Sequence, residues 1–201
     1  MEIYNNEDEQ LDAVRNFFRE NGKAIVVGVV LGIGGLFGWR YWQSHQHTSL
    51  TTASVSFDNA MLQSENTAGL EAFVQANGNT YGVFGALKLA QDLVEKGDFA
   101  KAKQQLQWAQ THTKDDNLLP AINLRLARIQ LQEKQFDDAL KTLDAVQKGG
   151  WFAQAQAIRG DVLVAKGDTK GARDAYTQAF EDNPSPVLKE LLRIKLNNLA
   201  A

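Results

Sequence analysis

The chain has 201 residues and a formal net charge of −3, which allows one domain of ordinary size together with a membrane anchor. It contains no cysteine, which excludes a disulfide framework and any thiolate site but leaves the compartment undecided. The first 23 residues carry the whole net charge, and the remainder balances 18 bases against 18 acids. Because the sequence offers no basic stripe for a phosphate backbone, no nucleic-acid partner is predicted.

Residues 8–20 follow an acidic lead and predict a short amphipathic helix. Leu11, Val14 and Phe18 recur at helical spacing, with acids early and bases late, as the helix dipole favours. Asn21-Gly22 predicts the end of this helix. We expect the helix to lie at the membrane surface, and the alternative is a mobile tail with coincidental spacing.

The segment 23–42, KAIVVGVVLGIGGLFGWRYW, predicts a transmembrane signal anchor. The 16 residues from Ala24 to Trp39 carry no charge. As a helix they span roughly 24 Å, and continuing to Trp42 gives roughly 28 Å, close to the roughly 30 Å of a bilayer core. Basic and aromatic residues flank the run, as at membrane interfaces. A buried core helix would not explain these flanks, and a cleaved signal peptide would need small residues where bulky ones stand.

The bases near the anchor predict its orientation. Arg15, Arg19 and Lys23 precede the apolar run, whereas Arg40 is the only base that follows it before Lys88. Positively charged flanks stay in the cytoplasm. The amino terminus is therefore expected to be cytoplasmic and the large carboxy-terminal part to lie across the membrane.

Glycines in the anchor form two GxxxG patterns, Gly28 with Gly32 and Gly34 with Gly38. Such spacing lets two helix backbones approach closely, so lateral packing of transmembrane helices is one hypothesis. The alternative is that glycine is simply common in membrane spans.

Residues 43–50 form a polar juxtamembrane joint that contains His45 and His47. A histidine pair at this spacing can bind a metal, but His112 is the only other histidine in the sequence. A solvated pair is predicted, and no metal is assigned.

From Thr51 onward the sequence predicts helix after helix, because Ala, Leu and Gln are frequent and alternating β-branched runs are missing. Clusters of Gly, Asn and Pro mark the breaks. The predicted helices span residues 49–63, 67–77, 80–96, 98–111, 117–133, 136–147, 150–166, 169–182 and 186–199.

Three of these helix pairs repeat one pattern, at residues 87–109, 124–146 and 157–179. A small residue on the first helix is followed twelve positions later by alanine and four further on by a bulky residue. The three sets are Ala90, Ala102 and Leu106; Ala127, Ala139 and Leu143; and Gly160, Ala172 and Tyr176. Steps of 37 and 33 residues resemble the tetratricopeptide repeat, whose period is about 34. Small residues let antiparallel helices pack closely, and the hairpins then stack. A generic helical bundle is the alternative.

Both ends of the array carry further helical patterns. Residues 53–76 resemble a decayed copy in which Ala60 and Ala72 are again twelve apart. At the other end, leucines at helical spacing predict a capping helix; they are Leu188, Leu191, Leu192, Leu196 and Leu199. Repeat arrays need such caps for solubility.

No HExxH, P-loop, GxGxxG or GxSxG motif occurs in the sequence. The acidic pairs Asp115-Asp116 and Asp137-Asp138 stand next to helix starts, where capping explains them. A non-enzymatic protein is therefore predicted, with no catalytic residue and no cofactor.

A protein-binding groove is predicted instead. In tetratricopeptide arrays the inner face comes mainly from the first helix of each hairpin, and it suits an extended or helical polypeptide. In the alternative, several of these residues are interior. The corresponding positions are Phe84, Leu87, Gln91, Val94, Ala121, Leu124, Arg128, Leu131, Gln154, Ala157, Asp161 and Val164.

Four further stretches carry a resemblance along the whole chain: FFRENGKA before the anchor, GWRYWQSHQ after it, NTYG at 79–82 and INLRLAR at 122–128. With these, the chain resembles the YfgM family. The resemblance implies a protein of the bacterial inner membrane with a periplasmic domain. It implies as partners the SecYEG translocon, a membrane-anchored chaperone of the PpiD type and newly exported polypeptides. It also implies restraint of the Rcs stress-response regulator from the cytoplasmic side.

The sequence thus predicts an all-α, single-span protein. A cytoplasmic tail (1–22), the anchor (23–42) and the joint (43–50) precede a periplasmic α-solenoid of tetratricopeptide-like hairpins (51–201). The predicted function is a protein-binding adaptor near the Sec translocon that assists chaperone action on exported proteins. The alternative is a membrane scaffold or regulator that acts through its transmembrane helix or its tail.

Overall fold

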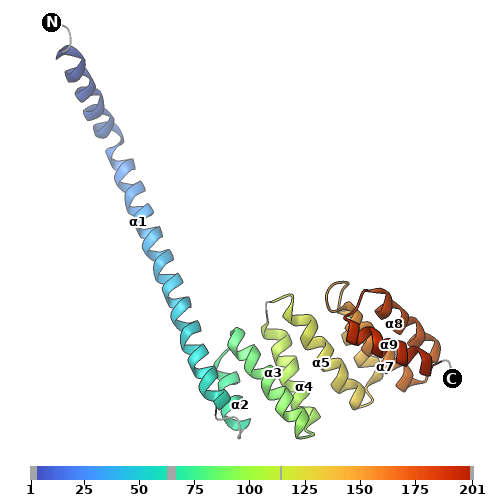
Figure 1. Ribbon diagram of the computed structural model, residues 1–201. Coiled ribbons are helices and arrows are strands. Elements are labelled where there is room, and N and C mark those ends of the chain that lie inside the picture. Colours follow the sequence, from blue (N-terminus) through green and yellow to red (C-terminus); the bar gives the residue numbers. More distant parts are fainter. Residues whose placement is uncertain (1–3, 63–66, 114, 200–201) are drawn as a thin grey trace. The chain divides into compact units, whose positions relative to one another are not determined.

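The computed structural model describes residues 4–62, 67–113 and 115–199, and within the first helix the side chains of residues 11, 14–43 and 51–62. Across these ranges every regular element is an α-helix, which confirms the predicted all-α class (Figure 1). The helices are α1 (Tyr4–Leu62), α2 (Thr67–Ala76), α3 (Thr80–Glu95), α4 (Phe99–His112), α5 (Leu118–Gln132), α6 (Phe136–Asp144), α7 (Phe152–Lys166), α8 (Thr169–Glu181) and α9 (Pro186–Asn198).

The chain divides into two compact units, residues 1–52 and 53–201, and α1 contributes to both. In the first unit, α1 carries an apolar stretch from Val14 to Gln43 with a mean hydropathy of 1.7, long and apolar enough to cross a membrane. Its apolar side chains are exposed, Leu31 and Phe37 among them. A helix that is apolar on all sides and covered by no protein is suited to lipid. These features support the predicted anchor.

The structure corrects two predicted helix boundaries. The backbone stays helical through Asn21-Gly22 and through residues 43–50, where the sequence predicts a helix end and a separate joint. The Asn21 side-chain amide donates to the Phe17 carbonyl oxygen at 3.1 Å, so this asparagine is accommodated within the helix. An interior glycine costs only about 1 kcal/mol, and the joint contains neither Gly nor Pro to break the helix.

In the second unit, α3–α4, α5–α6 and α7–α8 form three antiparallel hairpins, and the boundaries match the predicted ones closely. The turns of the first and third hairpins share one chemistry. Gly97 and Gly167 adopt left-handed backbone conformations, and Asp98 and Asp168 then cap the next helix with their carboxylates. The second hairpin puts Lys134 in the left-handed position instead, with φ at 59°.

Small residues bring the helices of each hairpin together, as predicted. The three alanines that start the second-helix pattern are fully buried: Ala102, Ala139 and Ala172. The closest approach is in the third hairpin, where a Cβ at Gly160 would lie 2.2 Å from the Tyr176 ring. Glycine is therefore required at this position because the aromatic ring fills the space of a side chain.

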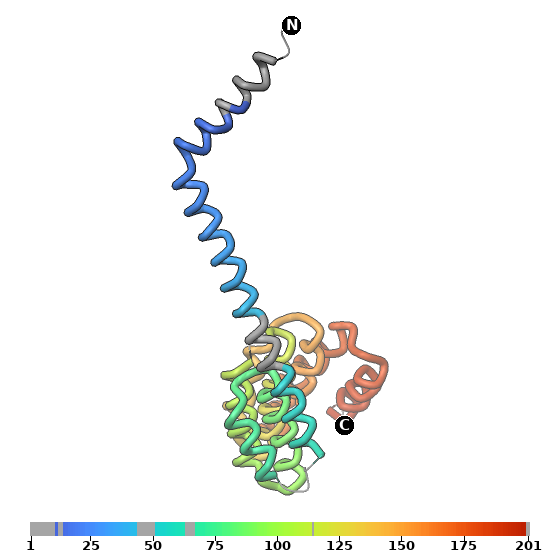
Figure 2. Tube along the Cα trace, turned by 90° about the vertical axis from the view of Figure 1, so that its left-hand side faces the viewer, coloured from blue at the N-terminus to red at the C-terminus, as the bar shows by residue number. Residues whose placement is uncertain are grey.

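Three apolar clusters connect the hairpins into one stack, which follows the chain order in Figure 1; Figure 2 shows this stack from the end that faces left in Figure 1. The first cluster joins α2 to α5, the second joins α5 to α7, and the third joins α7 to α9. Leu192 of α9 is fully buried in the third cluster, which confirms α9 as a capping helix.

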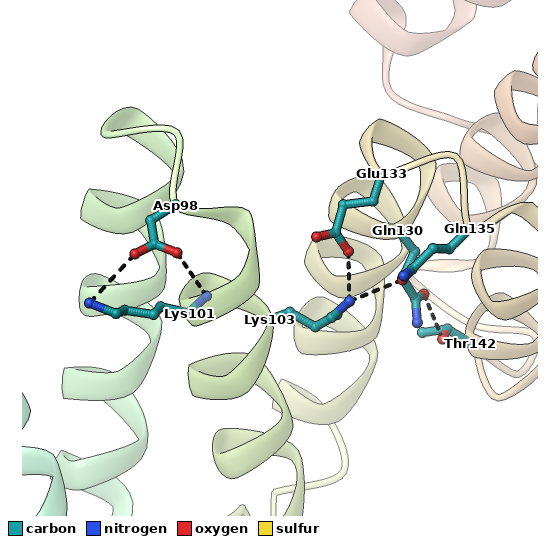
Figure 3. Close-up of polar contacts among 7 residues, drawn as sticks. All are labelled: Asp98, Lys101, Lys103, Gln130, Glu133, Gln135 and Thr142. Atoms are coloured by element: carbon teal, nitrogen blue, oxygen red, sulfur yellow. Dashed lines mark hydrogen bonds and ion pairs between the residues drawn. The ribbon is translucent and has the colours of Figure 1, made fainter.

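Polar contacts also link neighbouring hairpins. Lys103 of α4 donates to Glu133 at 2.6 Å and to Gln135 at 3.0 Å, on the turn between α5 and α6 (Figure 3). The buried Asn123 of α5 accepts from Gln110 of α4 at 2.8 Å. The first two hairpins are thereby fixed in one register.

The region before the first hairpin packs differently from the predicted decayed repeat. Phe57 at the end of α1 lies against Phe73 and Tyr81, with ring centroids 5.7 Å and 6.2 Å apart. Ala60 is partly buried there, but Ala72 is exposed, so the predicted equivalence of this pair with the repeat alanines is wrong. Larger residues of α2, such as Phe73, fill the contact instead.

Candidate protein-binding groove

A pocket of about 310 Å³ opens between α3 and α5, the first helices of the first two hairpins. Nine residues line it: Leu87, Ala90, Gln91, Val94, Glu95, Leu106, Arg125, Arg128 and Ile129. Four of the residues that the sequence predicts for the groove thus meet in one place: Leu87, Gln91, Val94 and Arg128.

The pocket has an apolar floor and a polar rim. Ala90, Leu106 and Ile129 are buried at its base, whereas the side chains of Gln91 and Glu95 are exposed. The Gln91 amide donates to the Glu95 carboxylate at 3.1 Å, one turn further along α3. An apolar recess with polar groups at its edge can take a side chain of a bound polypeptide and orient its backbone.

Other predicted groove residues lie elsewhere. Leu124 is only 4% exposed and belongs to the second cluster, where Leu131 also packs. Ala157 is buried in the third cluster. Phe84 is exposed and contacts the Tyr81 ring edge-on, with centroids 6.4 Å apart. These positions follow the helical period of the inner face, but neighbouring hairpins cover them to different extents.

In the third hairpin, the capping helix approaches the predicted groove positions. The Asp161 carboxylate accepts from the Tyr176 hydroxyl at 2.6 Å and from the Lys195 ammonium of α9 at 2.5 Å. Burial, together with the hydrogen bond to Asp161, raises the pKa of Tyr176 above its ordinary value. Val164 lines a recess of about 300 Å³ beside these groups. Asp161 is thus engaged within the chain.

Gln154 of α7 and Ala121 of α5 occupy the two remaining groove positions. The side-chain oxygen of Gln154 is buried and bonds no described residue. Ala121 of α5 is partly buried.

Two rim residues of the α3–α5 pocket are missing from the sequence-based set, Glu95 and Arg125. Arg125 precedes Arg128 by three positions on α5, which places both on one face of the helix. This three-residue spacing is the sequence feature from which Arg125 could have been predicted.

No described residue packs against the four glycines of the anchor's GxxxG patterns. A Cβ at Gly28, Gly32, Gly34 or Gly38 would meet nothing within 4 Å. Helix packing through them stays a prediction, and His45 and His47 lie outside the described side chains.

The family model of the tetratricopeptide repeat-like domain matches residues 15–201. A protein from Escherichia coli named "Ancillary SecYEG translocon subunit" is 47% identical over 205 residues, with both chains covered completely. Proteins of the same name from Haemophilus influenzae and Aggregatibacter actinomycetemcomitans are 39% and 35% identical, and each match covers 96% of this chain and 97% of the relative. The chain therefore belongs to the tetratricopeptide repeat-like family whose curated members in these bacteria bear the name ancillary SecYEG translocon subunit.

Proposed function

We propose that this protein is a non-enzymatic adaptor that is anchored in the bacterial inner membrane next to the Sec translocon and binds a polypeptide in its repeat domain. The observation that carries this proposal is the match to relatives named for the SecYEG translocon, which runs the full length of both chains at 47% identity. A function that needs both the anchor and the repeats would preserve both in one chain.

The proposed topology has the amino terminus in the cytoplasm and the repeats in the periplasm, as in a type II single-span protein. The exposed apolar stretch of α1 supports membrane insertion. The bases Arg15, Arg19 and Lys23 before it support the orientation, because positive flanks are retained in the cytoplasm.

The proposed partner in the periplasm is a membrane-anchored chaperone of the PpiD type or a newly exported polypeptide. The apolar pocket between α3 and α5 supports a polypeptide partner, since Leu87 and Val94 remain accessible from solvent there. Apolar side chains that stay accessible beside a recess are typical of a protein-interaction surface.

Site-specific photo-crosslinking in native membranes tests this proposal. A photoreactive residue at Leu87 or Arg128 should crosslink to a periplasmic polypeptide, whereas one at Lys141, exposed on the second helix α6, serves as the matched control. Crosslinks from the pocket positions to lipid alone, or no more crosslinks than at Lys141, would contradict the groove.

A scaffold that acts through its transmembrane helix is the second candidate, favoured by the open positions of Gly28 and Gly32. In that case Gly28→Leu with Gly32→Leu should abolish co-purification with SecYEG, and removal of residues 53–201 should not. A regulatory role of the cytoplasmic tail predicts instead that deletion of residues 1–22 has the largest effect.

A further inference from the structure

We infer that the pocket between α3 and α5 selects an acidic, apolar polypeptide segment. An apolar side chain of that segment fills the recess, and a side-chain carboxylate nearby pairs with Arg125 and Arg128. This inference rests on the proposed function and adds the chemistry of the partner.

The two arginines of the pocket differ from the other arginines of the repeat domain. Arg159 pairs with Asp144, Arg193 pairs with Glu190, and Arg173 donates to the Leu199 carbonyl oxygen. Arg125 and Arg128, by contrast, have no ion-pair or hydrogen-bond partner among the residues that the structure describes. Both unpaired guanidinium groups lie at the same recess.

The acidic side chains near the pocket already have partners on their own helix. Glu95 accepts a hydrogen bond from Gln91, and Asp92 pairs with Lys88 on the same helix. The lining therefore carries two positive charges against one negative charge. A basic segment would meet like charge there, whereas an acidic segment would meet its complement.

The spacing of the arginines suits a carboxylate. Residues three apart on a helix are neighbours, with Cβ atoms roughly 5–6 Å apart. Guanidinium groups present a planar fork of donors that matches a carboxylate in two parallel hydrogen bonds. With Leu106 and Ile129 at the floor, an apolar anchor and a carboxylate on one segment can be bound together.

Fluorescence anisotropy of two labelled peptides tests the inference, with the full chain reconstituted in nanodiscs of zwitterionic lipid. The peptides share the same leucine positions, and one carries Glu where the other carries Lys. We expect the Leu/Glu peptide to bind about ten-fold more tightly at low salt, as one or two favourable charge pairs imply. The preference should shrink at about 0.5 M salt, where the Debye length is about 4 Å.

Charge reversal gives the sharpest comparison. R125E with R128E should invert the preference between the two peptides, and both side chains are exposed, so the fold is not at risk. The matched control K141E with K170E reverses two exposed charges on α6 and α8, outside the pocket, and should leave the preference unchanged.

Equal affinity for the two peptides, or a preference that survives R125E with R128E, overturns the inference. If both peptides bind equally and V94K weakens the binding of both, the pocket binds polypeptide as proposed but has no preference for an acidic segment. If neither peptide binds and Leu87 also gives no crosslink to protein in membranes, the proposed function falls with it.

Discussion

At the scale of single residues, the third hairpin depends on a close contact between a glycine and an aromatic ring. Tyr176 occupies the space that a side chain at position 160 would need, whereas the equivalent positions of the other hairpins pair Ala90 with Leu106 and Ala127 with Leu143. Its hydroxyl then reaches Asp161, which also binds Lys195 of the capping helix. One side chain thus supports both the packing and the polar link to α9.

Gly160→Ala should destabilise the repeat domain by about 1–3 kcal/mol, because the new methyl group would overlap the Tyr176 ring and force it to move. Urea unfolding of the full chain in detergent, followed by circular dichroism, measures this loss. Gly69→Ala is the matched control. It lies inside α2 with nothing within 4 Å of its Cβ, so it should stabilise by up to about 1 kcal/mol. A G160A variant as stable as G69A would contradict the packing described.

Tyr176→Phe should make the stability of the fold less sensitive to alkaline pH. Because the pKa of Tyr176 is raised in the folded state, the protonated hydroxyl stabilises the fold fully below pH about 10. This stabilisation is lost as the pH rises above that value. The variant should cost about 1 kcal/mol near neutral pH for the lost hydrogen bond and unfold less steeply with pH above 10. Thermal unfolding across this range measures both effects. Tyr81→Phe is the matched control, because the Tyr81 hydroxyl bonds no described residue. This variant should keep the parent dependence of thermal stability on pH.

At the scale of helices and hairpins, local turn chemistry made the repeat domain predictable. Gly97-Asp98 and Gly167-Asp168 each combine a left-handed turn with a helix cap, so those boundaries follow from the sequence. The boundary at Asn21-Gly22 does not, because the same residue types can also be accommodated inside a helix when the flanking residues favour it.

Only part of the groove could be predicted from the sequence. Helical period places Leu87, Gln91 and Arg128 on the inner face, and they line one pocket. The period cannot tell how far the next hairpin covers each position, which is why Leu124 is buried. Nor does it reveal that Lys195 of the capping helix would engage Asp161, because that contact joins residues far apart in the sequence.

The capping helix should be held mainly by its buried leucine. Leu192→Ala is expected to cost about 2–5 kcal/mol, because Leu192 is 0% exposed within the third cluster. Leu191→Ala, at 45% exposure on the same helix, should cost much less. Hydrogen exchange of α9 distinguishes the two, and equal loss of protection in both variants would show that the buried contact does not hold the cap.

At the scale of the whole molecule, one chain joins an apolar membrane helix to a repeat domain with an open pocket. In the proposed function, the apolar helix places the protein in the membrane and the pocket offers a surface to a polypeptide. Relatives named for the translocon match both parts together. The proposed adaptor requires that these two surfaces act separately: changes in the pocket should alter which polypeptide is bound, and changes in the anchor should alter which membrane complex is joined.

Native purification from membranes, with identification of the co-purifying proteins, tests this separation most directly. The comparison is between the parent chain, Q91K with V94K at the pocket, and G28L with G32L in the anchor, all at exposed positions. We expect the pocket variant to lose a periplasmic polypeptide that the parent chain and the glycine variant retain. Recovery of the same polypeptides in equal amounts with the pocket variant would contradict it.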